Sequence, residues 1–296
     1  PIFDKLLGDC DVLLHNLAPG AAGRMGFGGE SLTARHPRMI VCEISGYGAG
    51  GPYENKKAYD LLIQNETGLV ATTGTPDAPA KAGISAADIA AGMYAFSGIL
   101  LALRKREQTG RGGVLQVSLF DALSEWMMPA GTYAAYGGTA PLPSGAEHAS
   151  IAPYGSYRCG DGTQINLAIQ NEREWARFCS LVLKRPEVAT DARFRLNPLR
   201  SANRAALRTV IEEVFSALTM QQVTERLDAA DIANAHRKTV QQFWEHPQHA
   251  ARNRWSNVDS PVGPIAALKP AIILDGVEPH MGAVPALGQH TETILS

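Results

Sequence analysis

The stretch Gly83–Met93 contains one carboxylate, Asp88, in an otherwise uncharged run. Ser85 is a favourable N-cap residue, and Asp88 follows three positions later, in the first turn of the helix that this pattern predicts. There the free amide groups and the helix dipole favour an ionised carboxylate, and Gly92, one turn further along, leaves room for a bulky group. An ionised, sterically open carboxylate can act as a nucleophile. Ser85 and Asp88 can equally form a capping-box-like pair, which needs no chemistry.

Apolar residues at helical spacing follow Asp88 and predict a long helix. The pattern ends at the basic run Arg104–Arg106, where positive charge suits the C-terminal end of a helix. The apolar positions are Ile89, Met93, Phe96, Leu100 and Leu103.

Two short apolar stretches upstream predict neighbouring strands of a parallel sheet. They are Val12–Leu14 and Met39–Ile44, and the stretch Gly29–Arg35 between them predicts a helix. The Gly-rich segment Gly46–Pro52 follows the second strand, and open α/β sheets bind ligands at the carboxyl ends of their strands. This segment is either a loop that lets the backbone approach a ligand or a plain surface loop, because it lacks both the dinucleotide and the P-loop spacing.

A strand at Val114–Leu119 and a helix at Asp121–Tyr136 are predicted next, and the Gly/Pro-rich segment 137–145 marks a domain boundary. The second domain has the pattern of an α+β fold. Its predicted elements are a β-hairpin of Gly155–Cys159 with Gln164–Ala168, helices at Glu172–Leu183, Arg204–Leu218, Met220–Ala229 and Val240–Glu245, and strands at Arg254–Val258 and Ala271–Leu274.

Composition agrees with a soluble enzyme rather than a nucleic-acid-binding protein. The chain has 296 residues, 45% of them hydrophobic, and a formal net charge of -2, which argues against nucleic acid or anionic membrane as the main partner. We expect no membrane span, because no apolar stretch approaches the required ~20 residues. Its four cysteines lack metal-ligand spacing, so we expect reduced thiols, a cytoplasmic location and no metal site. These cysteines are Cys10, Cys42, Cys159 and Cys179.

A series of short motifs, in this order along nearly the whole chain, resembles the class III (CaiB/BaiF-type) CoA-transferase family. That family also contains carnitine CoA-transferase, formyl-CoA transferase and the alpha-methylacyl-CoA racemases. The motifs are Asp11–Gly20, Arg24–Gly26, His36–Arg38, Ile44–Tyr53, Tyr59–Asp60, Gly68, Thr73–Gly74, the Asp88 helix, Thr109–Gly112, Pro153–Tyr154, Asp161–Gly162 and Pro285–Thr291.

The resemblance implies a Rossmann-like, doubly wound α/β large domain with a smaller α+β domain. The expected boundaries are a large domain over 1–140, a small domain over 150–253, and a segment 254–296 that returns to the large domain. Family members form a homodimer of two interlinked rings with each active site at the subunit interface. They also carry an N-terminal segment upstream of the region matched here, so this chain is expected to lack the first βα units of the sheet.

The resemblance also implies a role for Asp88. In the family, the matching aspartate attacks the thioester carbonyl of an acyl-CoA donor, forms a mixed anhydride and then an aspartyl-CoA thioester, and passes CoA to an acceptor carboxylic acid. CoA is therefore expected as part of a substrate, with no tightly bound cofactor. The motif around Tyr59–Gly68 and Gly83–Asp88 looks most like members that act on small dicarboxylic acids, and Arg158 or Arg173 would then bind the distal carboxylate.

Residues for binding CoA are implied by the formyl-CoA transferase pattern. Asn16, Arg24 and Lys57 match it, and the two cations suit the phosphates of CoA. Leu17 stands where an aromatic residue is common, which weakens the expectation of stacking on adenine. Lys57 can also be an ordinary surface lysine, and Tyr59 is expected either to shape the acyl pocket or to anchor the following helix as a buried aromatic.

Two other functions, a racemase and a non-catalytic assembly fragment, are alternatives to CoA transfer. A racemase needs a base on each face of the α-carbon, but the matching positions hold Tyr59 and Gln170, neither of which is a base near neutral pH. The second is a non-catalytic fragment that acts only in assembly, against which the intact Asp88 motif argues. Transfer of CoA is therefore the favoured hypothesis.

Overall fold

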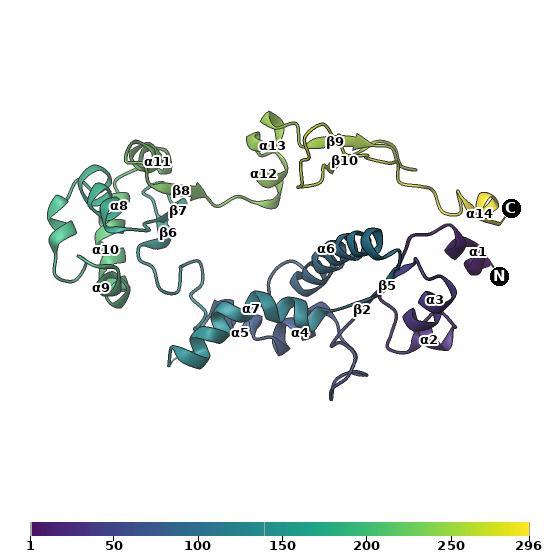
Figure 1. The fold of residues 1–296 in the computed structure, drawn as a ribbon. Coiled ribbons are helices and arrows are strands. Elements are labelled where there is room, and N and C mark those ends of the chain that lie inside the picture. The colour runs from purple at the N-terminus through teal and green to yellow at the C-terminus, as the bar shows by residue number, and fades with distance from the viewer. Residues whose placement is uncertain (1, 139, 296) are drawn as a thin grey trace. The chain divides into compact units, whose positions relative to one another are not determined.

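Three parallel strands form the sheet of the first part of the chain, in the order β1-β2-β5 (Figure 1). They are β1 (Val12–His15), β2 (Ile40–Ser45) and β5 (Gly113–Ser118), close to the predicted bounds. His15 pairs with Glu43, and Ser45 pairs with Ser118. Because the strands are parallel, their carboxyl ends lie along one edge of the sheet. The mixed α/β character expected from the sequence is confirmed.

The computed structural model describes residues 2–138 and 140–295. Contacts divide the chain into two compact units, residues 3–234 and residues 235–296, and the predicted domain boundaries stay predictions. Thr139, within the predicted linker, lies outside the described residues. The other elements up to the linker are α1 (Ile2–Gly8), α2 (Ala21–Arg24), α3 (Gly29–Arg35), α4 (Asp60–Glu66), α5 (Leu69–Thr72), β3 (Gly74–Thr75), β4 (Ala78–Pro79), α6 (Ala86–Thr109) and α7 (Leu119–Tyr136).

The long helix α6 was predicted correctly, but its buried face is not the one that the large apolar residues mark. Five alanines are buried. Ala86 and Ala87 pack toward α4 and α7, whereas Ala90 and Ala91 let the helix approach the sheet closely. The large residues on the other face, which gave the helical spacing, are about half exposed. The buried residues are Ala86, Ala87, Ala90, Ala91 and Ala95, and the exposed ones are Ile89, Met93, Phe96 and Leu100. We call the latter four the α6 stripe.

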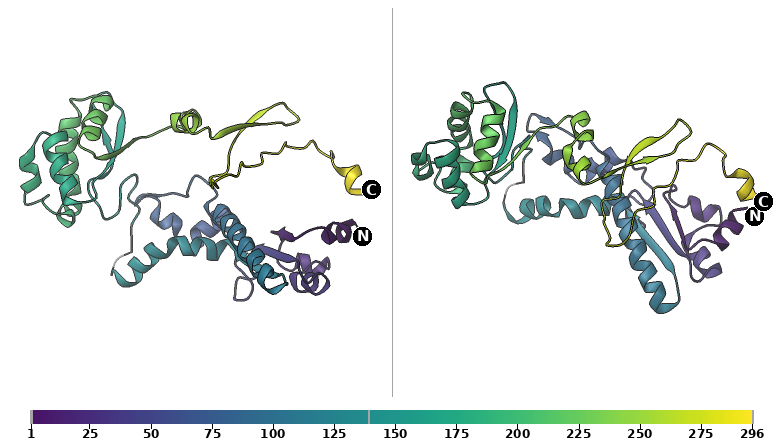
Figure 2. Two further views of the ribbon diagram at one scale, coloured as in Figure 1. Left: turned by 45° about the horizontal axis from the view of Figure 1, so that its top comes forward. Right: turned by 90° about the horizontal axis from the view of Figure 1, so that it is seen from above.

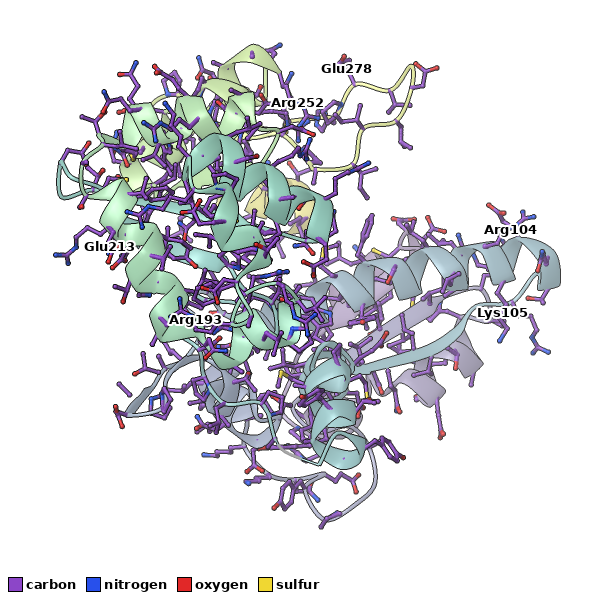
Figure 3. All side chains as sticks on the ribbon, turned by 90° about the vertical axis from the view of Figure 1, so that its left-hand side faces the viewer. Arg104, Lys105, Arg193, Glu213, Arg252 and Glu278 are labelled. Atoms are coloured by element: carbon purple, nitrogen blue, oxygen red, sulfur yellow. The ribbon has the colours of Figure 1, made fainter. Side chains whose placement is uncertain are left out.

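Helix α6 runs alongside β5 in the opposite direction, as both views in Figure 2 show. Near its start, Ala91 packs in a cluster with Ile44 and Val117, which belong to the carboxyl ends of β2 and β5. Near its end, Arg106 Nη1 lies 2.8 Å from Oδ1 of Asp11, just before β1. The first turn of α6 therefore lies at the carboxyl edge of the sheet, and Arg104 and Lys105 project from its other end (Figure 3).

The expectation that no stretch has the length and hydropathy of a membrane span was wrong for α6. Among the described residues, this 24-residue helix has both, with a mean hydropathy of 1.6 over its best window. The expectation was based on the charged residues at the ends of the helix. It did not take account of the alanines, which raise the mean hydropathy. In this structure Ala90 and Ala91 pack with Ile44 and Val117 of the parallel sheet.

The part that follows the linker is built on a sheet with strand order β6-β7-β8. Figure 2 shows its helices on one side of this sheet. The buried core of this part includes Trp175, Phe178 and Phe215. The predicted hairpin and helices are confirmed. The elements are β6 (Tyr154–Arg158), β7 (Gln164–Ala168), α8 (Glu172–Arg177), η1 (Phe178–Val182), η2 (Pro186–Thr190), α9 (Asn197–Ala202), α10 (Arg204–Phe215), α11 (Met220–Ala229) and β8 (Ala233–His236).

The unit of residues 235–296 contains one two-stranded antiparallel sheet, β9 with β10. The strand predicted at Ala271–Leu274 was wrong. Ile265–Leu268 pairs with β9 instead, because the turn Ser260–Gly263 directs it back, while the later stretch follows Pro270 and holds one isolated bridge at Leu274. The elements are α12 (Val240–Trp244), α13 (Pro247–Ala251), β9 (Trp255–Val258), β10 (Ile265–Leu268) and α14 (Thr291–Leu295).

A buried arginine joins several segments of the β6–β7 part. Arg200 is 1% exposed and donates to the carbonyl oxygen of Ala152 at 2.7 Å and to that of Phe194 at 3.0 Å. It also donates to Glu172 Oε2 at 2.7 Å and lies over the ring of Trp175. Its desolvated charge is therefore fully partnered, and its removal would leave buried acceptors unpaired.

Replacing Arg200 by methionine is expected to lower the free energy of unfolding by about 3 kcal/mol, because the buried carbonyls lose their donor. The measurement is urea-induced unfolding followed by tryptophan fluorescence. The matched control is Arg193→Met, which removes an exposed arginine that pairs with Asp191 and should cost much less. Equal losses in the two variants would contradict this role for Arg200.

Candidate active site

Three segments that the sequence singled out lie at the carboxyl edge of the parallel sheet. Asn16 and Leu17 follow β1, the Gly-rich segment Gly46–Pro52 follows β2, and Asp88 occupies the first turn of α6. Open α/β sheets bind their ligands at this edge, because the loops there diverge and leave backbone groups free. The edge is therefore the candidate site.

Asp88 is exposed, and it is the acidic residue in the first turn of α6. A Cβ added at Gly92, one turn further along, would meet no heavy atom within 4 Å. The space expected beside the carboxylate is therefore present in the structure.

The predicted cap by the Ser85 side chain was wrong. Ser85 occupies the N-cap position, but its hydroxyl makes no capping hydrogen bond. Instead, the backbone N–H of Ala87 donates to Oδ1 of Asp60 at 2.8 Å. Asp60 is the first residue of α4 and lies 27 positions earlier in the chain, so tertiary structure supplies the cap that the local sequence offered.

Gln64, one turn after Asp60, completes this arrangement and is fully buried. Its Nε2 donates to Oδ2 of Asp60 at 2.8 Å, and its Oε1 accepts from the N–H of Ala82 at 2.9 Å. Nε2 also lies 3.4 Å from the carbonyl oxygen of Ile84. The side chains of Asp60 and Gln64 thus hold the segment that leads into α6.

The start of the helix was expected to favour the ionised form of Asp88, but the net shift of its pKa has the opposite sign. Partial desolvation, and after it the negative charge of Asp60, raise the pKa of Asp88 above its ordinary value. The expectation was based on the amide groups of the helix alone. The carboxylate of Asp60, which α4 brings to the same helix end, was not part of it. Asp88 is therefore more basic than an aspartate at an isolated helix N-terminus.

A cavity of about 560 Å³ opens at the carboxyl ends of β1 and β2. Leu17, Gly48 and Ala49 line it, so the Gly-rich segment contributes to a concave site and is not a plain surface loop. Gly48 has a φ of 86°, a left-handed conformation that favours glycine, which lets the backbone turn back at the cavity.

The cavity wall is polar and partly acidic. Glu30, Glu43 and Glu54 line it together with His15 and Gln116. His15 Nε2 lies 3.8 Å from Glu43 Oε1, and neither ring nitrogen of His15 has a hydrogen-bond partner among the described residues. Because carboxylates repel phosphates, these walls suit an uncharged, hydrogen-bonding part of a ligand.

The two predicted phosphate-binding cations lie outside this lining and are both exposed. Arg24 ends α2, and its Nη1 would lie 3.0 Å from a Cβ at Gly20, which does line the cavity. Lys57 precedes α4 and forms no ion pair among the described residues, whereas its neighbour Lys56 pairs with Glu66 at 2.6 Å. Arg24 and Lys57 therefore have side chains available to an anion.

The other predicted residues are exposed as well. Asn16 and Leu17 are exposed, with Leu17 at 42%. Tyr59 is 72% exposed, so the alternative of a buried aromatic anchor was wrong; its side chain leaves the core just before α4 begins. Arg158 ends β6 and Arg173 lies in α8, and both are exposed in the β6–β7 part.

The contacts by which Asp60 and Gln64 hold the start of α6 were not predicted from the sequence. Asp60 was quoted as part of the Tyr59–Asp60 motif, and Gln64 follows it at the i+4 spacing that lets side chains meet on a helix. That spacing could have predicted the contact between Asp60 and Gln64. The hydrogen bond from Ala87 to Asp60 could not be predicted in this way, because it joins segments that only the tertiary structure brings together. The predicted residues of the first part thus form two groups: Lys57, Tyr59 and Asp88 in or just before α4 and at the start of α6, and Asn16, Leu17 and Arg24 around the cavity. Arg158 and Arg173 belong to neither group.

Comparison with known proteins agrees with this geometry. An acetyl-CoA:oxalate CoA-transferase of Acetobacter aceti is 33% identical over 254 residues, which are 85% of this chain and 65% of that protein. An acyl-CoA transferase of Fusarium pseudograminearum is 31% identical over 98% of this chain and 64% of its own length. The chain thus spans about two thirds of the length of these two relatives.

A crystal structure of a CAIB/BAIF family protein from Brucella suis has a TM-score of 0.84 and 31% identity, and the match covers 99% of this chain and 77% of that one. A Mycobacterium tuberculosis structure with a TM-score of 0.86 and 23% identity, covering 99% of this chain and 77% of that one, shares the fold. Residues 1–291 match the CoA-transferase family III. An exposed carboxylate at the start of a helix, a cavity at the same sheet edge and this match over nearly the whole chain agree: the protein belongs to the CoA-transferase family III.

Proposed function

We propose that this chain carries the nucleophile of an enzyme that moves CoA from an acyl-CoA thioester to a small dicarboxylic acid. The observation that carries the proposal is Asp88, an exposed carboxylate at the first turn of α6 with open space over Gly92. Two family relatives support the substrate class by their names, an acetyl-CoA:oxalate and a succinate–glutarate CoA-transferase.

In the proposed first half of the reaction, an oxygen of Asp88 attacks the thioester carbonyl carbon of the donor. The carbon–sulfur bond breaks, CoA leaves as a thiolate, and a mixed anhydride forms. The thiolate then attacks the carbonyl carbon of Asp88, releasing the donor acid as a carboxylate and leaving an aspartyl-CoA thioester. In the second half, the acceptor carboxylate repeats these two exchanges in reverse and restores Asp88.

For the CoA portion of the substrate, we propose contacts from two sides of the cavity. Asn16 and Leu17 would contact its uncharged part, since the cavity there has hydrogen-bonding and acidic walls. Arg24 and Lys57 would bind phosphates, Arg24 in the bidentate manner and Lys57 as a point charge. Tyr59, exposed directly before Asp60, would contact the acyl group near Asp88.

Replacing Asp88 by asparagine is expected to lower kcat at least about a thousandfold, because the amide is not a nucleophile of comparable strength. The direct measurement is trapping: the protein is incubated with succinyl-CoA and hydroxylamine, and mass spectrometry locates a hydroxamate on the peptide that contains Asp88. The Asp88→Asn variant should lack it. A hydroxamate on another residue, or none in folded protein with several acyl-CoA donors, would refute the proposed nucleophile.

Arg24→Gln and Lys57→Gln are each expected to raise KM for acyl-CoA about tenfold with little change in kcat, because each loses a charged hydrogen bond to phosphate. The matched controls are Arg104→Gln and Lys105→Gln, which remove the same charges at the opposite end of α6 (Figure 3). Steady-state kinetics with varied acyl-CoA gives both constants. Equal effects of the control variants would show a general charge effect in place of specific phosphate binding.

The proposed working form is a homodimer, and the exposed α6 stripe supports it. Its four large apolar side chains recur at helical spacing along one face of α6 and are about half exposed. Contiguous exposed apolar surface of this kind is typical of an interface. We expect sedimentation velocity to give a dimer for the wild type and a smaller species for Phe96→Glu. A monomeric wild type would refute the homodimer.

A further inference from the structure

The pair Asp60–Gln64 is the most highly connected polar group beside the proposed nucleophile. Gln64 is 0% exposed, and a fully buried amide is costly unless its donors and acceptor are all used. Its amide contacts three groups, one on Asp60, one on Ala82 and one on Ile84. It has no direct path to solvent or substrate, so any role in the reaction acts through its partners.

Asp60 is the partner that reaches the helix of the nucleophile. One carboxylate oxygen accepts from Gln64 and the other accepts from the N–H of Ala87, both at 2.8 Å. Ala87 is fully buried and packs in one cluster with Ile63 and Leu123, so its backbone is fixed by both packing and the hydrogen bond. Asp88 is the next residue, and its Cα position follows from that of Ala87.

We propose that Asp60 and Gln64 are positioning residues that fix the first turn of α6 and tune the Asp88 carboxylate for nucleophilic attack. This inference rests on the proposed function of Asp88. It assigns to the Asp60 carboxylate two effects, one geometric through the N–H of Ala87 and one electrostatic through its negative charge. Gln64 holds the Asp60 carboxylate in the orientation that both effects need.

The electrostatic effect has a definite sign. The start of a helix bears partial positive charge, which by itself makes an aspartate a weaker base and a weaker nucleophile. Asp60, on α4, places a full negative charge at the same helix end, and among the described residues it is the charged group that raises the pKa of Asp88. A more basic carboxylate is the better nucleophile toward the thioester carbonyl carbon.

The first test is Asp60→Asn, which keeps an oxygen for the N–H of Ala87 but removes the charge. We expect kcat to fall about tenfold to a hundredfold, KM for succinyl-CoA to change little, and the acidic limb of the kcat–pH profile to move to lower pH. The direction follows because removal of a neighbouring negative charge lowers the pKa of Asp88. The matched control is Asp77→Asn, an exposed aspartate in the β3–β4 turn, which should leave all three quantities unchanged.

A double variant separates positioning from simple loss of folding. In Asp60→Asn the new amide faces the Nε2 of Gln64, so two donors meet unless one side chain turns. Adding Gln64→Glu restores a donor–acceptor pair with the new amide, keeps an acceptor for the N–H of Ala82 and returns a carboxylate one helical turn away. It also removes the donor 3.4 Å from the carbonyl oxygen of Ile84, so recovery is expected to be partial. We expect this double variant to recover part of the lost kcat and to move the acidic limb back toward that of the wild type.

Trapping with succinyl-CoA and hydroxylamine distinguishes this inference from the proposed function. A wild type that forms no hydroxamate at Asp88 overturns both. A wild type that forms it, with Asp60→Asn trapping at the same rate and with the same pH profile, overturns the inference alone. Slower trapping at Asp88 in Asp60→Asn with partial recovery in the double variant supports it. If Asp60→Asn does not fold, Gln64→Met replaces it, because this variant removes the donor that orients Asp60; wild-type kcat in folded Gln64→Met overturns the inference.

Discussion

Close packing of the alanine face of α6 against the parallel sheet is the constraint on which the site depends. Alanines approach a sheet more closely than larger residues can, and the five buried ones run along the helix from its first turn. Contacts at both ends, Ala91 with Ile44 and Val117, and Arg106 with Asp11, fix the direction of the helix. The first turn of α6, which carries Asp88, consequently lies at the carboxyl edge of the sheet. The loops after β1 and β2 form a cavity at this edge, and its lining does not include Asp88.

The same packing explains why the large apolar residues of α6 are exposed. Only one face of a helix can pack against a sheet, and in α6 this is the face that carries the alanines. The α6 stripe therefore lies on the side away from β2 and β5, where it is available to another surface. The residues that gave the helical pattern in the sequence and the residues that the helix buries are different sets.

Two carboxylates, those of Asp60 and Asp88, lie at the start of α6 and differ in their hydrogen bonding and exposure. Asp60 accepts hydrogen bonds with both oxygens and is held by a buried amide, whereas Asp88 is exposed. A carboxylate whose oxygens are used in hydrogen bonds is a poor nucleophile, and one that faces open space is a good one. The division between a hydrogen-bonded carboxylate that stabilises the helix and an exposed one beside it is the basis of the chemistry proposed for the site.

Local sequence determined the elements and the candidate nucleophile. Short apolar runs and turn residues predicted strands at Val12–Leu14 and Met39–Ile44 and a helix at Gly29–Arg35, close to the observed elements, because these depend on neighbours in the chain. The resemblance to a family supplied the role proposed for Asp88. Tertiary structure alone decided what surrounds it: the cap comes from Asp60, 27 positions before Ala87, and the pKa of Asp88 rises because α4 brings that charge to the helix end. A sequence states charges and spacings along the chain, whereas both effects depend on distances between segments that only folding brings together.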